Sequence, residues 1–205
     1  MALESLHSTS ERILDAASEL FAERGFQDTS IRDISSRANV NLAAVNYHFR
    51  DKESLYEAIL LQSFEQIQKA YPFDLTGDSP EEHLEGFVRI LLFRLLGKGR
   101  PAIHGKLMAA EMASPTGALD RLCEDAIRPT HETLIGILRE LVGDAPEQDM
   151  NDLASCVLGQ CLVYKHAGHV LKRLHGGLPE EDDEIEKLAK QITAFSLAGI
   201  AAYRA

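Results

Sequence analysis

The chain has 205 residues, of which 45% are hydrophobic, and this composition suits one or two compact domains with a buried core. Its net charge of −11 argues against indiscriminate binding to nucleic acids, and its longest apolar run, residues 194–203, is too short to cross a membrane. The first twelve residues lack the apolar run of a signal peptide, and the three cysteines are an odd number, so we expect a cytoplasmic protein with reduced thiols.

Helical patterns follow one another along the whole chain, and no segment alternates with period two for long enough to predict a strand. The first helix is predicted over residues 10–24, where apolar side chains recur on one face, and Gly25 ends it as a C-cap. We therefore predict an all-α fold. Proline and glycine cluster at the breaks between later helices, at residues 72–80, 97–101, 114–117, 143–146 and 176–179.

Two short helices joined by a tight turn are predicted over residues 30–37 and 42–49, which is the pattern of a helix-turn-helix. Thr29 or Ser30 caps the first of these helices. The turn contains Asn39, a residue type that tolerates the left-handed backbone conformation such a turn requires.

The second helix of this pair has a narrow face that suits the major groove of DNA. With Val45 and Phe49 turned inward, the opposite face carries Leu42, Ala43, Asn46 and Tyr47. Asparagine is a common reader of adenine in the major groove, and Tyr47, His48 and Lys52 lie toward the end of the helix, where they suit phosphate oxygens. The alternative is that these side chains merely cover a small three-helix bundle.

The acidic charge lies mostly outside this motif. Residues 34–52 carry Arg37, Arg50 and Lys52 against Asp51 alone. Because salt screens charges beyond about 10 Å, this local balance matters more for DNA than the net charge does. A fourth helix is predicted from residue 52 or 53 to residue 69.

An ordered series of residues between positions 10 and 60 carries a family resemblance. The series is Ile13, Leu14, Ala16, Ala17, Leu20, Phe21, Gly25, Phe26, Thr29, Ser30, Ile34, Ala38, Asn39, Val40, Tyr47, His48, Phe49, Lys52, Glu53 and Leu55. In this order and spacing it resembles the TetR/AcrR family of bacterial transcriptional regulators. The resemblance implies an all-α homodimer with an N-terminal helix-turn-helix domain and a C-terminal domain for ligand binding and dimerisation.

The resemblance also implies which residues contact DNA. These are Thr29, Ser30, Arg32, Asn41, Leu42, Ala43, Asn46, Tyr47, His48 and Lys52. Two features depart from the family pattern: Asn39 replaces the usual turn glycine, and residues 42–44 replace the usual small polar pair. Few base-contacting donors remain on the recognition helix, so Arg32 and Asn46 are expected to carry more of the readout.

The remainder of the chain is less diagnostic. Residues 106–129 and 159–167 resemble the CecR type of C-terminal domain. We predict a DNA-binding domain over residues 1–52 and a ligand-binding and dimerisation domain over residues 53–205, with the helix at 53–69 connecting the two.

In the family, filling of a C-terminal cavity moves the connecting helix and spreads the two recognition helices. Our candidate wall combines apolar bulk with a few polar groups, as small-molecule sites do: Phe64, Phe87, Leu91, His104, Met108, Glu111, Leu134, Cys161, Tyr164 and His166. We expect an amphipathic organic effector, neutral or cationic. The alternative is a solid core in which Glu111 pairs with an arginine such as Arg89, Arg94 or Arg128 and the histidines bond to the backbone.

Metal binding and catalysis find little support in the sequence. His104, Glu111, His131, His166 and His169 invite a metal interpretation, and the pair His166 and His169 would share a face of one helix. No further pair of metal-ligand spacing accompanies them, so we predict no metal and no cofactor. A hydrolytic site built from His104, Glu111 and His166 would lack any nucleophile or phosphate-loop motif, so we predict that the protein is not an enzyme.

Two long helices are predicted at the C-terminal end, over residues 151–175 and 182–203. The last one is apolar nearly all round and must be covered on every side, partly by its own domain and partly by residues 153–171 of a twofold partner. The predicted dimer interface contains Ile192, Phe195, Ala198, Gly199 and Ala202.

These expectations combine into one function. We predict a homodimeric repressor that releases a palindromic DNA operator when a small organic effector fills the C-terminal cavity, with no membrane partner. The alternative is a helix-turn-helix protein that acts as an activator, or through protein partners without a small-molecule ligand.

Overall fold

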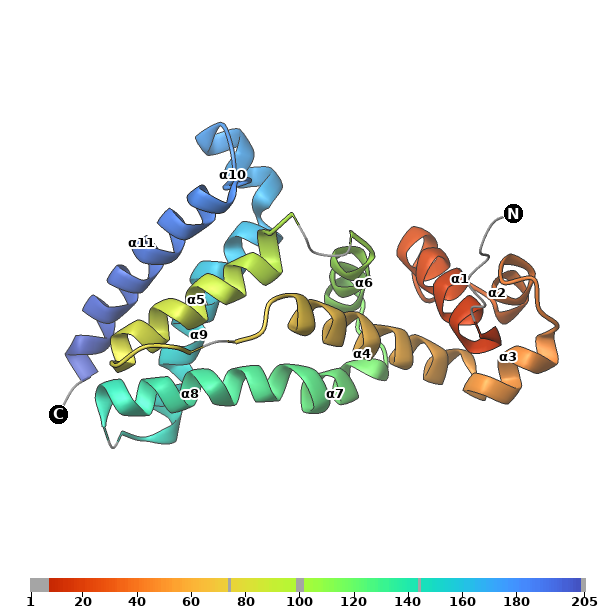
Figure 1. Cartoon of the computed structure of the whole chain (residues 1–205), viewed down its shortest axis with the longest axis horizontal. Coiled ribbons are helices and arrows are strands. Elements are labelled where there is room, and N and C mark those ends of the chain that lie inside the picture. Colours follow the sequence, from red (N-terminus) through yellow and green to blue (C-terminus); the bar gives the residue numbers. More distant parts are fainter. Residues whose placement is uncertain (1–7, 74, 99–101, 144, 204–205) are drawn as a thin grey trace. The chain divides into compact units, whose positions relative to one another are not determined.

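The computed structural model describes residues 8–73, 75–98, 102–143 and 145–203. Most of these residues are helical and none of them forms a strand (Figure 1), which confirms the all-α prediction. The helices of the described ranges are α1 (Thr9–Arg24), α2 (Ile31–Arg37), α3 (Leu42–Phe49), α4 (Lys52–Ala70), α5 (Pro80–Leu96), α6 (Ala102–Ala113), α7 (Ala118–Leu122), α8 (Arg128–Val142), α9 (Glu147–His166), α10 (Gly168–His175) and α11 (Asp182–Ile200). Among them, none is both long and apolar enough to cross a membrane.

The chain divides into two compact units. One contains the described residues up to 66 together with 102–126, and the other contains 67–98 together with 127–203. The predicted functional boundary after residue 52 concerns DNA binding rather than packing, and it stays a prediction.

The first unit is built around α1. This helix packs against α2, α3 and α6, and its apolar stripe, which includes Ile13 and Leu20, is fully buried. Phe21 of α1 contacts the ring of Tyr56 on α4 edge-on at 4.9 Å, and Phe26 lies 5.0 Å from the same ring. This aromatic cluster fixes the start of α4, the helix that directly follows the helix-turn-helix.

The second unit is a helical bundle in which α5 packs against α8, α9 and α11. Figure 1 shows α5 running beside α11. Its core contains fully buried Leu84, Phe87, Leu134 and Cys161. A hydrogen bond of 3.0 Å from the Gln160 side chain to Ser196 joins α9 to α11.

The predicted continuous helix over residues 151–175 is wrong. Helix α9 ends at His166, and α10 begins at Gly168 after Ala167 leaves the helical conformation, with φ −102° and ψ 16°. Leu178 packs close to this break, because a Cβ atom on Gly168 would lie 3.1 Å from its Cδ1 atom. His166 and His169 consequently belong to different helices and do not form the predicted pair on one helix face. The π-helical segment Cys123–Ile127 between α7 and α8 was likewise not predicted.

Candidate nucleic-acid interface

The start of α2 is fixed by two neighbouring hydroxyl groups with different roles. Ser30 is the N-cap: its Oγ accepts from the Asp33 N–H at 3.1 Å, and the Asp33 carboxylate accepts from the Ser30 N–H. The Ser30 hydroxyl also donates to the Asp33 carboxylate, and this bond, followed by the one from the Ser30 N–H, lowers the pKa of Asp33. Thr29 is 1% exposed and donates to the carbonyl oxygens of Gly25 and Leu20. Its predicted role as a cap and DNA contact is therefore corrected: Thr29 anchors the chain before α2, and its side chain does not face solvent.

The turn between α2 and α3 is held from α1. Asn39 adopts φ +52°, the left-handed conformation expected of it. The guanidinium of Arg12 donates to the carbonyl oxygens of Ala38 and Asn39, both at 2.6 Å. Carbonyls at a helix C-terminus lack intrahelical partners, and a charged donor satisfies them well. Arg12 thus fixes the angle at which α3 leaves the turn, a role that sequence patterns do not indicate because the contact joins residues 26 and 27 positions apart.

Helix α3 is anchored on one side and exposed on the other. The Asn41 side chain caps it by accepting from the Ala44 N–H at 2.8 Å, while Val45 is buried. Tyr47 is 86% exposed and Leu42 46%, so large side chains project from this face into solvent. The Tyr47 ring lies edge-on to that of its neighbour His48, with the ring centres 5.2 Å apart. The predicted contact residues that the structure exposes here are Asn41, Leu42, Ala43, Asn46, Tyr47 and His48.

Lys52 lies at the beginning of α4 and already has protein partners. Its Nζ donates to the Phe26 carbonyl oxygen at 3.0 Å and lies 4.2 Å from the centre of the Phe26 ring. A lysine ammonium has three donors, so this arrangement holds the charge in place and leaves N–H groups for a phosphate oxygen.

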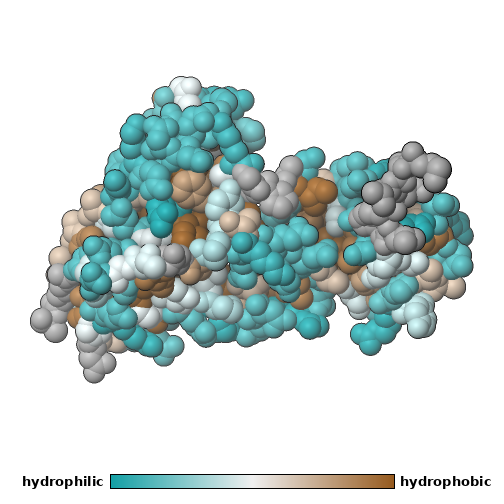
Figure 2. Space-filling view, viewed as in Figure 1, coloured by the Kyte–Doolittle hydropathy of each residue, from teal (hydrophilic) through white to brown (hydrophobic). Residues whose placement is uncertain are grey.

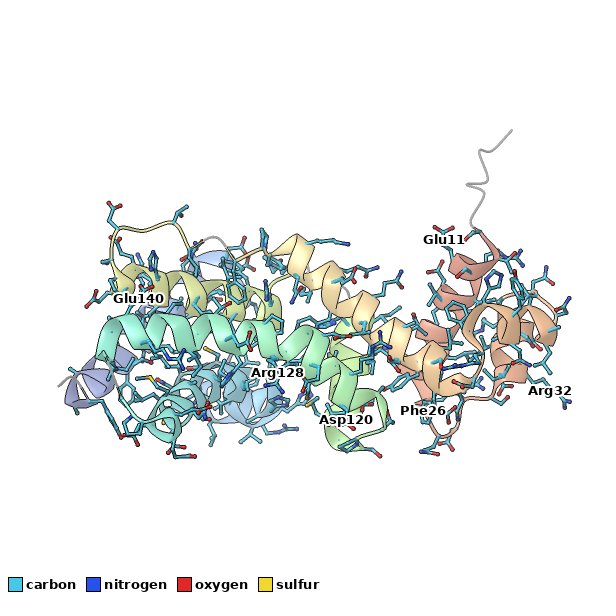
Figure 3. All side chains as sticks on the ribbon, turned by 90° about the horizontal axis from the view of Figure 1, so that it is seen from below. Glu11, Phe26, Arg32, Asp120, Arg128 and Glu140 are labelled. Carbon is cyan, nitrogen blue, oxygen red and sulfur yellow. The ribbon has the colours of Figure 1, made fainter. Side chains whose placement is uncertain are left out.

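Two further arginines border this face. Figure 3 shows Arg32 at the outer edge of the first unit, pointing away from the helices. The Arg50 side chain is 87% exposed and lies next to Asp51 at 3.9 Å. Arg50 was not among the predicted contacts, although its place beside Tyr47 and His48 in the sequence was a usable signal. Arg37 is committed instead to α1, through ion pairs with Glu19 and Glu23 at 3.0 and 3.6 Å.

The predicted effector wall is divided between the two units. Phe64, His104, Met108 and Glu111 belong to the first unit, and Phe87, Leu91, Leu134, Cys161, Tyr164 and His166 belong to the second. In the second unit Phe87, Leu134 and Cys161 are part of the close-packed core, against which Leu91 and Tyr164 pack. Burial raises the pKa of Cys161 to about 12, so this thiol is an inert core group. The wall as a whole stays a prediction.

The buried carboxylate Glu111 has neutral partners. It accepts from the Thr116 N–H at 2.8 Å and from the Thr116 hydroxyl, and the Tyr56 hydroxyl also donates to it; burial and this carboxylate together raise the pKa of Tyr56. Arg89 and Arg94, which were considered as ion-pair partners of Glu111, have other partners. Arg89 lies 3.8 Å from Glu186, and Arg94 donates to the Tyr71 carbonyl and stacks on the ring of Phe73.

Metal-ligand groups do not gather anywhere in the described part of the chain. No cluster of three or more His, Cys, Asp or Glu residues that could hold a metal ion occurs among these residues. His104 instead shares a hydrogen bond of 3.1 Å with Ser63 and lies edge-on to Phe64.

One of the five residues predicted for the dimer interface is buried within its own unit, and the other four are exposed. Ile192 is 5% exposed and packs in the core of its own unit, which removes it from the interface. Phe195 is 73% exposed, and Ala198, Gly199 and Ala202 are also exposed on α11 and the turn that follows it.

Comparisons with known proteins agree with this geometry. Residues 13–59 match the family model "Bacterial regulatory proteins, tetR family", and residues 80–200 match "HTH-type transcriptional dual regulator CecR, C-terminal domain". The Bacillus subtilis probable regulator YttP is 37% identical over 84 residues, 41% of each chain. The transcriptional repressor Rv3405c of Mycobacterium tuberculosis is 36% identical over 124 residues, 60% of this chain and 61% of that one.

The alignments thus span about two fifths to three fifths of the length of these curated relatives. A solved structure described as a TetR-family transcriptional regulator from Mesorhizobium loti shares the fold, with a TM-score of 0.65 and 20% identity over 93% of this chain and 96% of that one. The matched relatives are transcriptional regulators and not enzymes. The family model of the C-terminal domain matches 121 residues (80–200), more than half of the chain, and the helix-turn-helix matches the tetR model. The chain therefore belongs to the TetR family of DNA-binding transcriptional regulators and has a CecR-type C-terminal domain.

Proposed function

We propose that the protein is a homodimeric repressor that binds a palindromic operator and releases it when a small organic effector binds. The exposed face of α3 carries this proposal. Asn46 offers an amide to base edges. Tyr47 is 86% exposed, and the ring it contacts, that of His48, belongs to the same exposed face. The relative named as a repressor supports the direction of regulation.

Homodimerisation is proposed from the second unit. Helix α11 packs against α9, on which Ser155, Cys156, Gly159 and Val163 are also exposed. Small residues permit two helices to approach closely, and Phe195 and Val163 supply apolar area that is unusual for free surface. A twofold axis through α9 and α11 would cover both sets of exposed residues in one four-helix interface.

A selection of binding sites from random duplex DNA tests this function. If the two recognition helices of a symmetric dimer enter successive major grooves, the preferred site is a palindrome whose half-sites lie about 34–36 Å apart. The purified full-length protein should enrich such a palindrome, and its enrichment should disappear with the double variant Asn46→Ala, Tyr47→Ala. Enrichment of no sequence, or of a single unpaired half-site, contradicts the proposal.

Activation is the second candidate, because the family model of the C-terminal domain is described as that of a dual regulator. A reporter in which the selected operator is moved from within a promoter to a position upstream of it distinguishes the two. A repressor lowers expression only at the first position, whereas a dual regulator raises expression from the second.

A further inference from the structure

A hollow of about 270 Å³ lies in the first unit between α1, α4 and α6. Its floor is apolar and consists of Ile59, Leu107 and Ile103, of which the first two are buried. Figure 2 shows hydrophobic atoms reaching the surface among hydrophilic ones where α6 approaches α1. This volume is close to the lower end of small-molecule sites and lies outside the close-packed core of the second unit.

The rim of the hollow is polar and acidic. Asp15 and Glu19 border it from α1, and Gln62 and Gln66 border it from α4. Within the described ranges the side chains of Asp15, Gln62 and Gln66 make no hydrogen bond or ion pair. Two carboxylates four residues apart on one helix repel each other. Arg37, which lies outside the lining, offsets Glu19 at 3.0 Å, whereas the lining contains no lysine or arginine to offset Asp15.

The remaining wall is rigid. Ser63 donates to the Leu60 carbonyl at 2.9 Å, so its oxygen accepts from the Nδ1–H of His104 at 3.1 Å. The His104 ring is further held edge-on against Phe64. A preformed wall beside the polar side chains of the rim is what a binding site for a small molecule requires, because little ordering is needed when the molecule binds.

We propose that this hollow binds a small amphipathic amine. The ammonium group lies between the carboxylates of Asp15 and Glu19, the amides of Gln62 and Gln66 complete its hydrogen bonds, and the apolar body covers Ile59, Ile103 and Leu107. The two carboxylates repel an anion, and a neutral molecule leaves the charge of Asp15 without a partner.

Occupancy of the hollow reaches the helix-turn-helix through one ion pair. Glu19 also holds Arg37 of α2 at 3.0 Å, so a bound ammonium competes with Arg37 for this carboxylate. Arg37 then keeps only the longer ion pair with Glu23, at 3.6 Å, and α2 is held less firmly to α1. Exposed ion pairs are individually weak, which sets the expected loss of operator affinity at about two- to fivefold. This coupling rests on the proposed function, whereas the binding of the amine does not.

Calorimetric titration of the full-length protein with benzylamine tests the site. Benzyl alcohol is the neutral probe of nearly equal size, and we expect benzylamine to bind at least about tenfold more tightly. Asp15→Asn should remove this preference. Asp28→Asn is the matched control, because Asp28 is also exposed and carries the same charge but lies outside the hollow. Equal effects of the two variants would show only a general attraction to an acidic protein and would overturn the site, as would the absence of benzylamine binding.

A second measurement separates the site from the regulator. Affinity for the selected duplex should fall about two- to fivefold in saturating benzylamine, and should not change in Asp15→Asn. Unchanged affinity in the wild type overturns the coupling. A protein that binds benzylamine but no duplex contradicts the proposed function alone, whereas one that binds the duplex but no benzylamine contradicts the hollow alone.

Discussion

Single side chains in the helix-turn-helix fall into two groups, those proposed to contact DNA and those that set the geometry of the motif. Asn46 and Tyr47 are exposed on α3. Thr29 and Arg12 bond to backbone carbonyls within the unit. Substitutions in the two groups should have different consequences. A substitution in the first group should alter DNA recognition, and one in the second group should alter the position of the recognition helix.

Asn46→Ala should relax the preference for one base pair in each half-site, with a loss of about 1–3 kcal/mol at that position. Tyr47→Ala should weaken binding to all sequences similarly, because a contact to phosphate carries no sequence information. Competition binding with a set of single-base operator variants measures both. A uniform loss for Asn46→Ala would remove it from base readout.

Arg12→Met should lower the free energy of unfolding by about 1–2 kcal/mol, because the carbonyls of Ala38 and Asn39 lose a charged donor. Arg24→Met on the same helix is the control, since the exposed side chain of Arg24 makes no hydrogen bond or ion pair among the described residues, and it should stay within about 0.5 kcal/mol of the wild type. Urea unfolding followed by circular dichroism gives both values. Equal losses for the two variants would mean that Arg12 has no special role in the turn.

At the scale of elements, α11 has two faces with different partners. Ile185, Leu188 and Ile192 face the core of their own unit, while Phe195, Ala198 and Gly199 are exposed. These exposed residues, together with those of α9, are the reason for placing the dimer interface there. The cysteines of α9 offer an independent probe, because Cys156 is exposed and Cys161 is buried.

Ala198→Arg should produce monomers, because it places a bulky charge at a close helix contact in the proposed interface. Ala113→Arg introduces the same side chain at an exposed position of α6 and should leave the dimer intact. Sedimentation velocity at micromolar concentration measures the assembly. A monomeric wild type, or an Ala198→Arg dimer, contradicts the interface.

Thiol labelling extends this experiment to α9. Cys156 should react slowly in the dimer and rapidly in Ala198→Arg, because the partner no longer covers it. Cys161 should stay unreactive in both, since burial raises its pKa to about 12 and few thiolates form. Equal labelling of Cys156 in the two proteins would place α9 outside the interface.

For the whole molecule, a net charge of −11 sets how the protein meets DNA. Non-specific binding depends on phosphate neutralisation, so an acidic chain with a few fixed cations near α3 should bind bulk DNA weakly. We therefore expect the proposed operator to be distinguished chiefly by shape and base contacts rather than by charge. Lys52, held on Phe26 at the start of α4, is the cation whose position is best defined.

Lys52→Ala should reduce the slope of log affinity against log salt by about one for each subunit. Lys106→Ala is the control, because Lys106 is an exposed lysine of the same unit on α6, away from α3 in the sequence and outside the helix-turn-helix. Titration of the selected duplex from low to moderate salt measures the slope. An unchanged slope for Lys52→Ala would show that its ammonium stays with the Phe26 carbonyl in the complex.

The sequence by itself determined the helices and most of their ends, because periodicity and capping depend on residues within about four positions of one another. Residue types typical of helix ends and turns have those roles here: Gly25 ends α1, Ser30 and Asn41 cap α2 and α3, and Asn39 adopts the left-handed conformation of the turn. The family resemblance over residues 10–60 also came from local order and spacing. The fold class and the exposed face of α3 therefore follow from local sequence patterns.

Only the tertiary structure decided contacts between distant segments. It buried Thr29, brought Arg12 to the α2–α3 turn, gave Glu111 neutral partners instead of an arginine, and turned Ile192 toward its own core. It also placed Leu178 of the following loop against Gly168, beside the break at Ala167. Each of these contacts depends on which side chains meet after the helices pack. Helical periodicity predicts the side of a helix on which a residue lies, but it does not predict which other helix covers that side.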